Sequence, residues 1–223
     1  MSEYQIRLYQ DSDYEKVREI FSDGIIENST RAFHISLRHH SIWAFMLLTF
    51  SLVLWINGSL LMSLLALIAD MGLLYWLSRY IYVSYVQACL ADDMLDIRQY
   101  YLHRDGYCFW VAESMGEVAG MVAAVPHHHH GGETQVELKR LSVPRKHRGK
   151  GIAKALTRTV IDYARRRGCQ AVLLETSYPQ VVAWQMYEKM GFQKIATAPA
   201  PNLVGKLIGF TILFYQFDLH IER

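Results

Sequence analysis

The stretch from Val136 to Gly168 most constrains the fold, because it encodes a strand, a basic glycine loop and a helix in direct succession. Apolar and polar residues alternate before Pro144, which closes the strand since proline has no amide hydrogen for a ladder. This alternation predicts one face with Val136, Leu138 and Arg140 and another with Glu137, Lys139, Leu141 and Val143. A strand that leads directly into a helix favours a fold of the α/β (α+β) class.

The helix after the loop has one continuous apolar stripe. Its members follow the i, i+3, i+4, i+7 spacing and are Ile152, Ala155, Leu156, Thr159, Val160, Tyr163 and Ala164. Arginines at positions 165–167 occupy the last turn, where cations suit the negative end of the helix dipole, and Gly168 supplies the stop. We therefore expect a buried helix packed on the strand that precedes it.

The loop between strand and helix has the properties of an anion-binding site. Gly149 and Gly151 allow backbone amides to approach a ligand closely, and the helix start offers unpaired amides and the positive end of the dipole. Basic residues crowd the region: Lys139, Arg140, Arg145, Lys146, Arg148, Lys150 and Lys154. The spacing fits neither a nucleotide P-loop nor a dinucleotide-binding fingerprint. A basic helix start with no ligand is the alternative interpretation.

The loop resembles a known cofactor motif. Arg148-x-x-Gly151-x-Ala153 is similar to the Q/R-x-x-G-x-G/A signature of GNAT-type acetyltransferases, whose loop holds the pyrophosphate of acetyl-CoA. The resemblance implies pyrophosphate contacts from Arg148, Gly149, Lys150, Gly151, Ile152, Ala153 and Lys154. It also implies that the strand edge at Leu141 and Val143 pairs with the pantetheine arm and polarises the thioester carbonyl.

A second segment extends this resemblance toward the C-terminus. The family pattern N-x-x-A-x-x-x-Y-x-x-x-G-F is matched except at its first position, where Gln180 replaces the usual asparagine. The resemblance implies that Gln180 makes a weaker capping contact to the cofactor. It also places the Tyr187 phenol beside the CoA sulfur as the general acid, with a half-buried core tyrosine as the alternative. For the general base the hypothesis is Glu137, with Glu175, a histidine of residues 127–130 or a water relay as alternatives.

A long apolar run interrupts this pattern near the N-terminus. Residues 42–78 are almost entirely apolar and are broken at Asn57-Gly58-Ser59, where a helical hairpin would turn. As one helix the run would reach about 55 Å, against about 30 Å of bilayer hydrocarbon, whereas each arm alone is short for a full span. We expect two short membrane helices or a shallow re-entrant hairpin, with a buried helical pair in a soluble protein as the alternative. The one charge in the run, Asp70, is expected to face the partner helix or the headgroups.

Both ends of the run must lie on one side of the membrane, because the strand at Tyr4–Tyr9 and the later strands are expected to share one sheet. Arg31, Arg38 and Arg79 flank the run, and basic flanks prefer the cytoplasm, so we predict a cytosolic catalytic domain. The predicted division is 1–34 for the first strand and helix, 35–85 for the membrane hairpin and 86–223 for the remainder of the catalytic domain.

The remaining elements complete a mixed central sheet flanked by helices. We expect strands at Tyr107–Glu113, Glu117–Val125 and Ala171–Ser177, helices from Ser12 or Asp13 to Ile26, over Ala91–Leu102 and from Val182 to Met190, and a last strand or hairpin within Leu203–Leu219. The helix at 91–102 is predicted to bury Met94, Leu95, Ile97 and Tyr101. The final segment is a candidate for a further membrane contact.

Charge and cysteine content argue against several classes of protein. A net charge of +2 and a pI near 8.4 give no reason to expect a nucleic-acid partner. Cys89, Cys108 and Cys169 are odd in number and widely spaced, so neither a disulfide framework nor a C-x-x-C metal site is expected. Contiguous histidines at 127–130 do not converge on one ion without distortion, so we expect a solvated loop there and no metal.

Three features together resemble one family: H-R-G-K-G-I-A-K-A-L-T-R-T-V, the apolar double segment after the first helix, and C-F-W-V-A-E. They are similar to the camello-like N-acetyltransferases, also called the N-acetyltransferase 8 group. The resemblance implies the GNAT acyl-CoA N-acyltransferase fold with an inserted membrane hairpin, in endoplasmic reticulum or Golgi membranes. It implies transfer of acetyl from acetyl-CoA to a primary amine of a cysteine S-conjugate or a protein lysine, or of aspartate in a sister branch.

The alternative function is a membrane-tethered protein of the same fold. It would act mainly through protein association in cell adhesion or development, with weak or no catalysis. In either case the membrane segment is a candidate surface for homo-oligomer formation. Binding of acetyl-CoA separates the two hypotheses, because only the enzyme needs a working cofactor loop.

Overall fold

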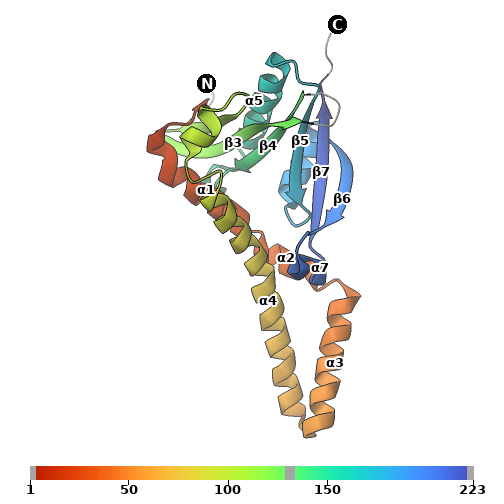
Figure 1. Ribbon diagram of the computed structural model, residues 1–223. Coiled ribbons are helices and arrows are strands. Elements are labelled where there is room, and N and C mark those ends of the chain that lie inside the picture. The colour runs from red at the N-terminus through yellow and green to blue at the C-terminus, as the bar shows by residue number, and fades with distance from the viewer. Residues whose placement is uncertain (1–3, 129–133, 220–223) are drawn as a thin grey trace.

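The computed structural model describes residues 4–128 and 134–219, which form one seven-stranded sheet with helices on both faces and a projecting helical hairpin (Figure 1). In spatial order the strands are β1 (Gln5–Leu8), β2 (Cys108–Ser114), β3 (Glu117–His128), β4 (Thr134–Ser142), β5 (Ala171–Ser177), β7 (Thr211–Asp218) and β6 (Gln193–Pro199). Among these strands, β4 and β5 pair in parallel and all other neighbours are antiparallel. This mixed sheet confirms the predicted fold class.

Helices cover the two faces of the sheet and enclose two apolar cores. On one face lie α5 (Ile152–Arg166) and α6 (Val181–Lys189), and on the other lie α1 (Tyr14–Ile26) and the end of α4 (Leu60–Ala91). The α5 core includes Leu156, Val160, Val172 and Leu174, and the α1 core includes Val17, Phe21, Phe109 and Met121. Short helical turns occur at Asp11–Asp13, Arg98–Leu102 and Arg145–His147. The functional residues therefore lie on a sheet that is supported from both sides.

The sheet opens between its two central strands. β4 and β5 pair from Gln135–Ala171 to Leu138–Leu174, and within the described residues the ladder ends there. Their carboxyl ends then diverge (Figure 1). The edge of β4 that faces β5 after Leu138 consequently has amide and carbonyl groups without a ladder partner, which an extended ligand can satisfy.

A bulge in β4 resets the predicted alternation of its side chains. Arg140 has a φ of 57°, and β4 has one extra residue between its pairs with Ala123 and Met121 of β3. The α5 side receives Val136, Leu138, Leu141 and Val143, whereas Arg140 turns to the α1 side, where its guanidinium lies over the Phe21 ring. The two predicted faces are therefore wrong beyond Lys139, because the extra residue moves each later side chain to the opposite face.

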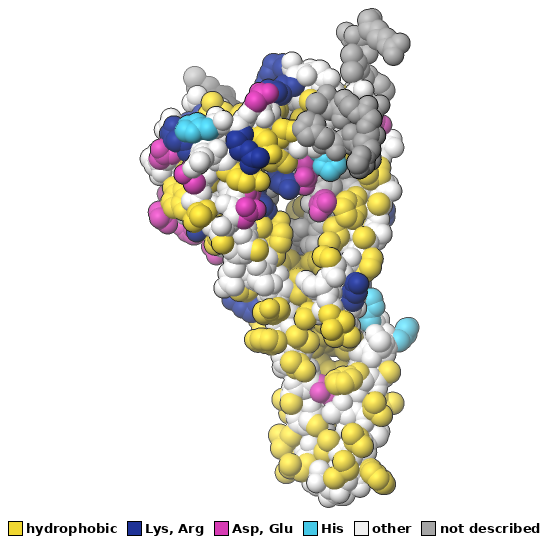
Figure 2. Space-filling view, viewed as in Figure 1, with side chains coloured by type: hydrophobic (Ala, Val, Ile, Leu, Met, Phe, Trp, Pro, Cys, Tyr) yellow, Lys and Arg dark blue, Asp and Glu magenta, His cyan; other side chains and the backbone are white. Residues whose placement is uncertain are grey.

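The apolar run forms an antiparallel hairpin of α3 (His40–Asn57) and α4 that projects away from the sheet (Figure 1). Gly58, with a φ of 61°, ends α3, and the hydroxyl of Ser59 accepts from the Met62 amide at 3.4 Å to cap α4, so the predicted turn is confirmed. Both helices are long and apolar enough to cross a membrane, and most of their surface is exposed. Figure 2 shows apolar side chains over the length of the hairpin, which excludes the alternative of a buried helical pair.

The second helix of the hairpin is longer than predicted. α4 continues past Ser78 to Ala91, across the predicted boundary between residues 85 and 86, and its last turns pack in the α1 core. The predicted helix over 91–102 is wrong in its first half, because the backbone leaves the helical region at Asp92 and residues 92–96 form turns. Its second half is helical, as one π-helical turn at Arg98–Leu102. Of its predicted apolar set, Met94, Ile97 and Tyr101 are buried and Leu95 is exposed. The domain division itself stays a prediction.

Three further elements were not predicted. α2 (Ser29–Ser36) precedes the hairpin, β6 forms one edge of the sheet, and α7 (Leu203–Leu207) precedes β7. The residues of β6 are mostly exposed, so no apolar alternation marks the strand. At the base of the hairpin, α2, α4 and α7 share a third small core around Leu74, Ile81 and Ile208. This core joins the hairpin to the domain that contains the sheet.

Candidate active site

The glycine loop leads from β4 into α5 in the conformation that its sequence favours. Gly149 and Gly151 have φ values of 80° and 81°, in the left-handed region that glycine adopts most readily. A β carbon at Gly149 would meet no described atom within 4 Å, and one at Gly151 would meet the Tyr4 hydroxyl at 3.9 Å. Lys150 lies between them and is exposed. The loop backbone is therefore open to a ligand on this side.

The first turn of α5 adds amide groups to the loop. The ladder of the helix begins with the Ala155 amide, which donates to the Gly151 carbonyl at 3.0 Å, and no side chain among the described residues caps the helix. The amides of Ile152, Ala153 and Lys154 therefore have no helical acceptor and lie at the positive end of the dipole. The structure thus brings these predicted pyrophosphate contacts together with the two glycines.

The arginine side chains of the loop turn toward α1. Nε of Arg145 donates to the Glu27 carboxylate at 2.8 Å, and Nη2 of Arg148 pairs with the other oxygen of the same carboxylate. Nε of Arg148 also donates to the Val143 carbonyl at 2.9 Å. These contacts fix the loop between β4 and the end of α1. The Arg148 guanidinium is already paired, so the backbone is the main donor set of the loop.

Tyr187 lies in α6 with its ring in the α5 core, and it is 5% exposed. The ring packs against Phe192 with 5.6 Å between centroids. Burial raises the pKa of Tyr187 above that of an ordinary phenol, which is already protonated at neutral pH. None of the described residues hydrogen-bonds its hydroxyl, which distinguishes Tyr187 from the core tyrosine Tyr215, whose hydroxyl donates to Glu188 at 2.8 Å.

Gln180 closes the turn from β5 into α6. Its Oε1 accepts from the Ser177 amide at 3.0 Å and from the Thr176 hydroxyl at 2.8 Å. The hydroxyl of Tyr82, on α4, lies 3.4 Å from the Ser177 hydroxyl and joins this group to the hairpin. The side-chain oxygen of Gln180 is therefore used within the protein, and its contribution near the opening is to hold this turn.

Two glutamates lie where β4 and β5 diverge. Glu137 pairs with Nζ of Lys139 at 3.2 Å. Burial and the nearby charge of Glu137 raise the pKa of Glu175, while the charges of Lys139 and His127 oppose this shift. Figure 2 shows acidic, basic and histidine side chains gathered at the edge of a hollow in this part of the molecule. The site therefore combines a carboxylate pair with an open strand edge.

The histidine tract differs in part from its prediction. His127 and His128 extend β3 opposite Gln135 and Thr134, so the predicted loop begins later than expected. The other two histidines, at positions 129 and 130, lie outside the described residues. Within the described part of the chain, no group of three or more His, Cys, Asp or Glu side chains is arranged to hold a metal ion.

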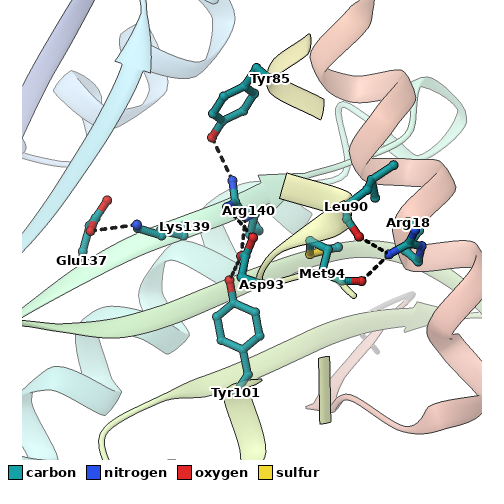
Figure 3. A network of polar contacts seen from close by, with 9 residues as sticks. All are labelled: Arg18, Tyr85, Leu90, Asp93, Met94, Tyr101, Glu137, Lys139 and Arg140. Atoms are coloured by element: carbon teal, nitrogen blue, oxygen red, sulfur yellow. Dashed lines mark hydrogen bonds and ion pairs between the residues drawn. The ribbon is translucent and has the colours of Figure 1, made fainter. Parts of the chain in front are cut away.

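Sequence reasoning missed a buried polar network beside the β4 bulge (Figure 3). Asp93, just after α4, binds the Arg140 guanidinium through two hydrogen bonds of 2.7 and 2.8 Å. The Tyr101 hydroxyl donates to the same carboxylate, and Nη1 of Arg140 donates to the Tyr85 hydroxyl at 2.8 Å. Asp93 and Arg140 are 47 residues apart and belong to no common motif, so no local signal predicts their contact.

Sequence comparison assigns the family. The chain matches the family model described as Acetyltransferase (GNAT) family over residues 72–192. N-acetyltransferase 8F1 of Mus musculus is 42% identical over 196 residues, which cover 87% of this chain and 88% of that protein. The "Probable N-acetyltransferase camello" of Xenopus laevis is 34% identical over 220 residues, which cover 98% of this chain and 99% of that protein.

Solved structures share the fold. An acetyltransferase of the GNAT family from Staphylococcus aureus Mu50 has a TM-score of 0.56 at 16% identity, and the match covers 97% of this chain and 99% of that one. A Salmonella typhimurium protein solved with its cofactor acetyl-CoA has a TM-score of 0.55 at 20% identity, over 99% of this chain and 96% of that one. At these identities the likeness shows the fold alone, whereas the sequence relatives show the family. The chain is therefore an acetyltransferase of the GNAT family, and within it a member of the N-acetyltransferase 8 group to which camello belongs.

Proposed function

We propose that this chain transfers an acetyl group from acetyl-CoA to a primary amine while anchored to a membrane. Two observations carry the proposal: the unpaired edge of β4 and the uncapped start of α5, which the glycine loop connects. We propose that they form one binding surface. An extended arm that ends in phosphates fits this surface, because a strand edge offers ladder groups and a helix start offers amides to anions. When bound, acetyl-CoA supplies the activated acetyl group. The chain's own residues hold and orient the acetyl-CoA, and they exchange protons with the reacting groups.

The backbone is proposed to hold the two ends of this arm. Backbone amides of the loop and of the first turn of α5 bind the pyrophosphate. These amides belong to Arg148, Gly149, Lys150, Gly151, Ile152, Ala153 and Lys154. Edge groups of β4 at Leu141 and Val143 orient the arm and polarise the thioester carbonyl. Gln180 supports the facing end of β5 through its contacts with Thr176 and Ser177.

Tyr187 and Glu137 are proposed to exchange the protons. The amine nitrogen forms a bond to the acetyl carbon, the carbon–sulfur bond breaks, and the amine proton passes to the Glu137 carboxylate. The Tyr187 phenol, which like any tyrosine is protonated at neutral pH, donates its proton to the departing sulfur. Glu175 is the second candidate for the base, because its pKa is raised by burial and by the neighbouring Glu137 charge.

The proposed acceptors are cysteine S-conjugates and protein lysines, because both present a primary amine. The test offers S-benzylcysteine, a lysine peptide and aspartate to microsomes that contain the full chain, together with labelled acetyl-CoA. Transfer to one acceptor and not to the others assigns the substrate class. Binding of acetyl-CoA without transfer to any amine contradicts the proposal and favours the membrane-tethered association protein.

The loop assignment has its own test in two glycines at opposite ends of α5. Gly151→Glu places a carboxylate at the proposed phosphate site, and Gly168→Glu places one at the C-terminal end of the same helix. Both glycines have positive φ, 81° and 70°, and open surroundings, so the backbone strain is matched. We expect acetyl-CoA affinity to fall at least tenfold in Gly151→Glu alone, on the order of one lost phosphate contact. Equal affinities in the two variants contradict the loop assignment.

The hairpin is proposed to anchor the enzyme in the endoplasmic reticulum or Golgi membrane. An aromatic band of Trp43, Tyr75, Trp76 and Tyr80 is exposed where the hairpin meets the domain, as expected for side chains at a membrane interface. On α7, which packs against α4, Leu203 and Leu207 are also exposed. From this band to the tip the hairpin extends about 20 Å along α3 from Trp43, and about 24–30 Å along α4 from Trp76 and Tyr80, against roughly 30 Å of hydrocarbon. The shorter arm does not reach the full hydrocarbon thickness, which favours insertion without crossing.

Orientation is tested at the tip of the hairpin. Asn57-Gly58-Ser59 is a glycosylation sequon, and we propose that it stays out of the lumen while the catalytic domain is cytosolic. With a flexible Gly/Ser linker inserted on each side of the sequon, no glycan should be added in cells, and protease should digest the domain on intact microsomes. A glycosidase-sensitive gel shift contradicts insertion without crossing, and protection from protease contradicts the cytosolic orientation.

A further inference from the structure

A buried ion pair joins the end of α4 to the β4 bulge (Figure 3). The side chains of Arg140 and Asp93 are only 9% and 3% exposed, and the two hydrogen bonds between them are 2.8 and 2.7 Å long. The Arg140 guanidinium also lies over the rings of Phe21 and Tyr85, with 5.2 and 5.8 Å to their centroids. Arg140 is therefore held from several sides, by groups that come from α1, from α4 and from the turn that follows it.

Stability alone is a poor explanation for this arrangement. Removal of two charges from water costs several kcal/mol, and well-packed apolar residues often replace such a pair with no loss of stability. Arg140 also occupies the left-handed region with a φ of 57°, which costs a non-glycine residue about 1 kcal/mol or more. Two unfavourable features thus coincide at one residue, which points to a geometric requirement at this position.

The position of the pair indicates what that requirement is. Arg140 follows Leu138, where the ladder between β4 and β5 ends, and directly precedes the open edge at Leu141 and Val143. Burial opposes the charge of Arg140, but the hydrogen bonds and charge of Asp93 raise its pKa well above the ordinary value, so the guanidinium stays charged. Asp93 therefore holds Arg140, the residue whose left-handed backbone conformation reverses the faces of β4.

We infer that Asp93 and Arg140 are a positioning pair that sets the β4 bulge, and with it the strand edge that receives the acetyl thioester. This inference rests on the proposed function. Neither side chain contacts the reacting groups, so both act through the backbone of Leu141 and Val143. Because Asp93 lies in the turn that directly follows α4, the pair also links the hairpin to the cofactor strand.

The test separates the shape of the strand from its stability. Asp93→Asn leaves Arg140 buried without its charge partner, whereas the double variant Asp93→Leu/Arg140→Met replaces the pair by apolar groups. We expect kcat to fall at least tenfold in both variants, on the order expected of a misplaced reacting group, with KM for acetyl-CoA changed less than about threefold because the glycine loop is intact. The double variant should melt at or above the temperature of the wild-type chain.

Arg18→Met is the matched control. Arg18 also holds the end of α4, through hydrogen bonds to the carbonyls of Leu90 and Met94, but no hydrogen bond or ion pair joins it to a described residue of β4 (Figure 3). This variant should lower the melting temperature and keep kcat within about twofold, on the order of a small barrier change. If the double variant recovers wild-type kcat, or if Arg18→Met loses as much kcat as Asp93→Asn, the pair is merely structural and the inference is overturned.

The wild-type chain in the same assay keeps the two proposals apart. Absence of transfer by the wild-type chain overturns the proposed function, whereas wild-type transfer with unchanged double-variant kcat overturns only the positioning role. Full-length protein in detergent micelles is used throughout, so the hairpin stays attached to the domain. If Asp93→Asn does not fold, the double variant and Arg18→Met still decide the question.

Discussion

The two faces of β4 are built from different kinds of contact. Toward α5, the strand buries apolar side chains such as Val136 and Leu138 against the helix that directly follows the glycine loop. Toward α1, the same strand places Arg140 in a polar network whose partners, Asp93 and Tyr85, come from the distant α4 region. The first face is local and apolar, and the second is long-range and charged. The difference suggests a division of roles under the proposed function, in which the α5 side supports the cofactor and the α1 side sets the shape of the strand.

The largest expected effect tests the catalytic role of a residue on the α5 side. Tyr187→Phe removes a hydroxyl that no described residue hydrogen-bonds, so the melting temperature should stay within about 1 °C of wild type, as expected for a change well under 1 kcal/mol. Loss of the proton donor should lower kcat about 100-fold with little change in KM for acetyl-CoA. Steady-state kinetics of the full chain in micelles measure both constants.

A second tyrosine in the same core provides the control. Tyr215→Phe removes the hydrogen bond to Glu188, 2.8 Å long, and should cost about 1 kcal/mol of stability while leaving kcat unchanged. The two substitutions therefore have opposite expected signatures. Comparable kcat losses in both would mean that disturbance of the core, not loss of a proton donor, explains the Tyr187 effect.

The next effect concerns the charged side of the opening and is read from a pH profile. A general base works only when deprotonated, so activity falls as the pH drops through its pKa. If Glu137 is the base, Glu137→Gln should lower kcat/KM at least tenfold at every pH. If Glu175 is the base, activity should survive, and the acid limb should move to lower pH because the neighbouring negative charge that raises the pKa of Glu175 has gone.

The same contrast between the two sides explains what the sequence could predict. The strand, loop and helix around Gly151 and the hairpin turn at Gly58 were predictable because glycines, apolar periodicity and motif spacing are local signals. The bulge at Arg140 was not predictable, since strand register depends on a partner strand elsewhere in the chain. The contact of Arg140 with Asp93 was not predictable either, because the two residues are distant in the sequence and only the folded chain brings them together. Exposed β6 lacked an apolar pattern altogether.

A smaller effect probes the packing on the α5 side. A β carbon at Gly120 of β3 would lie 3.0 Å from Ile152, 3.1 Å from Leu156 and 3.1 Å from Val143. Branched core side chains surround it on several sides, so Gly120→Ala should cost about 1–3 kcal/mol in the free energy of unfolding. The start of α5 would shift with Ile152, so KM for acetyl-CoA should also rise. Denaturant unfolding and acetyl-CoA titration measure the two effects, and a variant with normal values for both would contradict tight packing here.

The smallest effect is expected from the equivalent glycine on the α1 side. A β carbon at Gly24 of α1 would overlap Oγ of Ser142, but that hydroxyl can rotate away at the cost of its 3.0 Å hydrogen bond to the Ile20 carbonyl. The lost bond costs about 1 kcal/mol, and alanine gains up to about 1 kcal/mol over glycine in a helix. The free energy of unfolding of Gly24→Ala should therefore lie within about 0.5 kcal/mol of the wild-type value. In a Ser142→Ala background no hydroxyl remains to be displaced, so Gly24→Ala causes no overlap. Relative to Ser142→Ala alone, it should therefore gain most of the stabilisation that alanine gives a helix over glycine. If Gly24→Ala instead loses as much stability as Gly120→Ala, the α1 side is packed as rigidly as the α5 side. In that case the charged network would not be needed to fix the shape of β4.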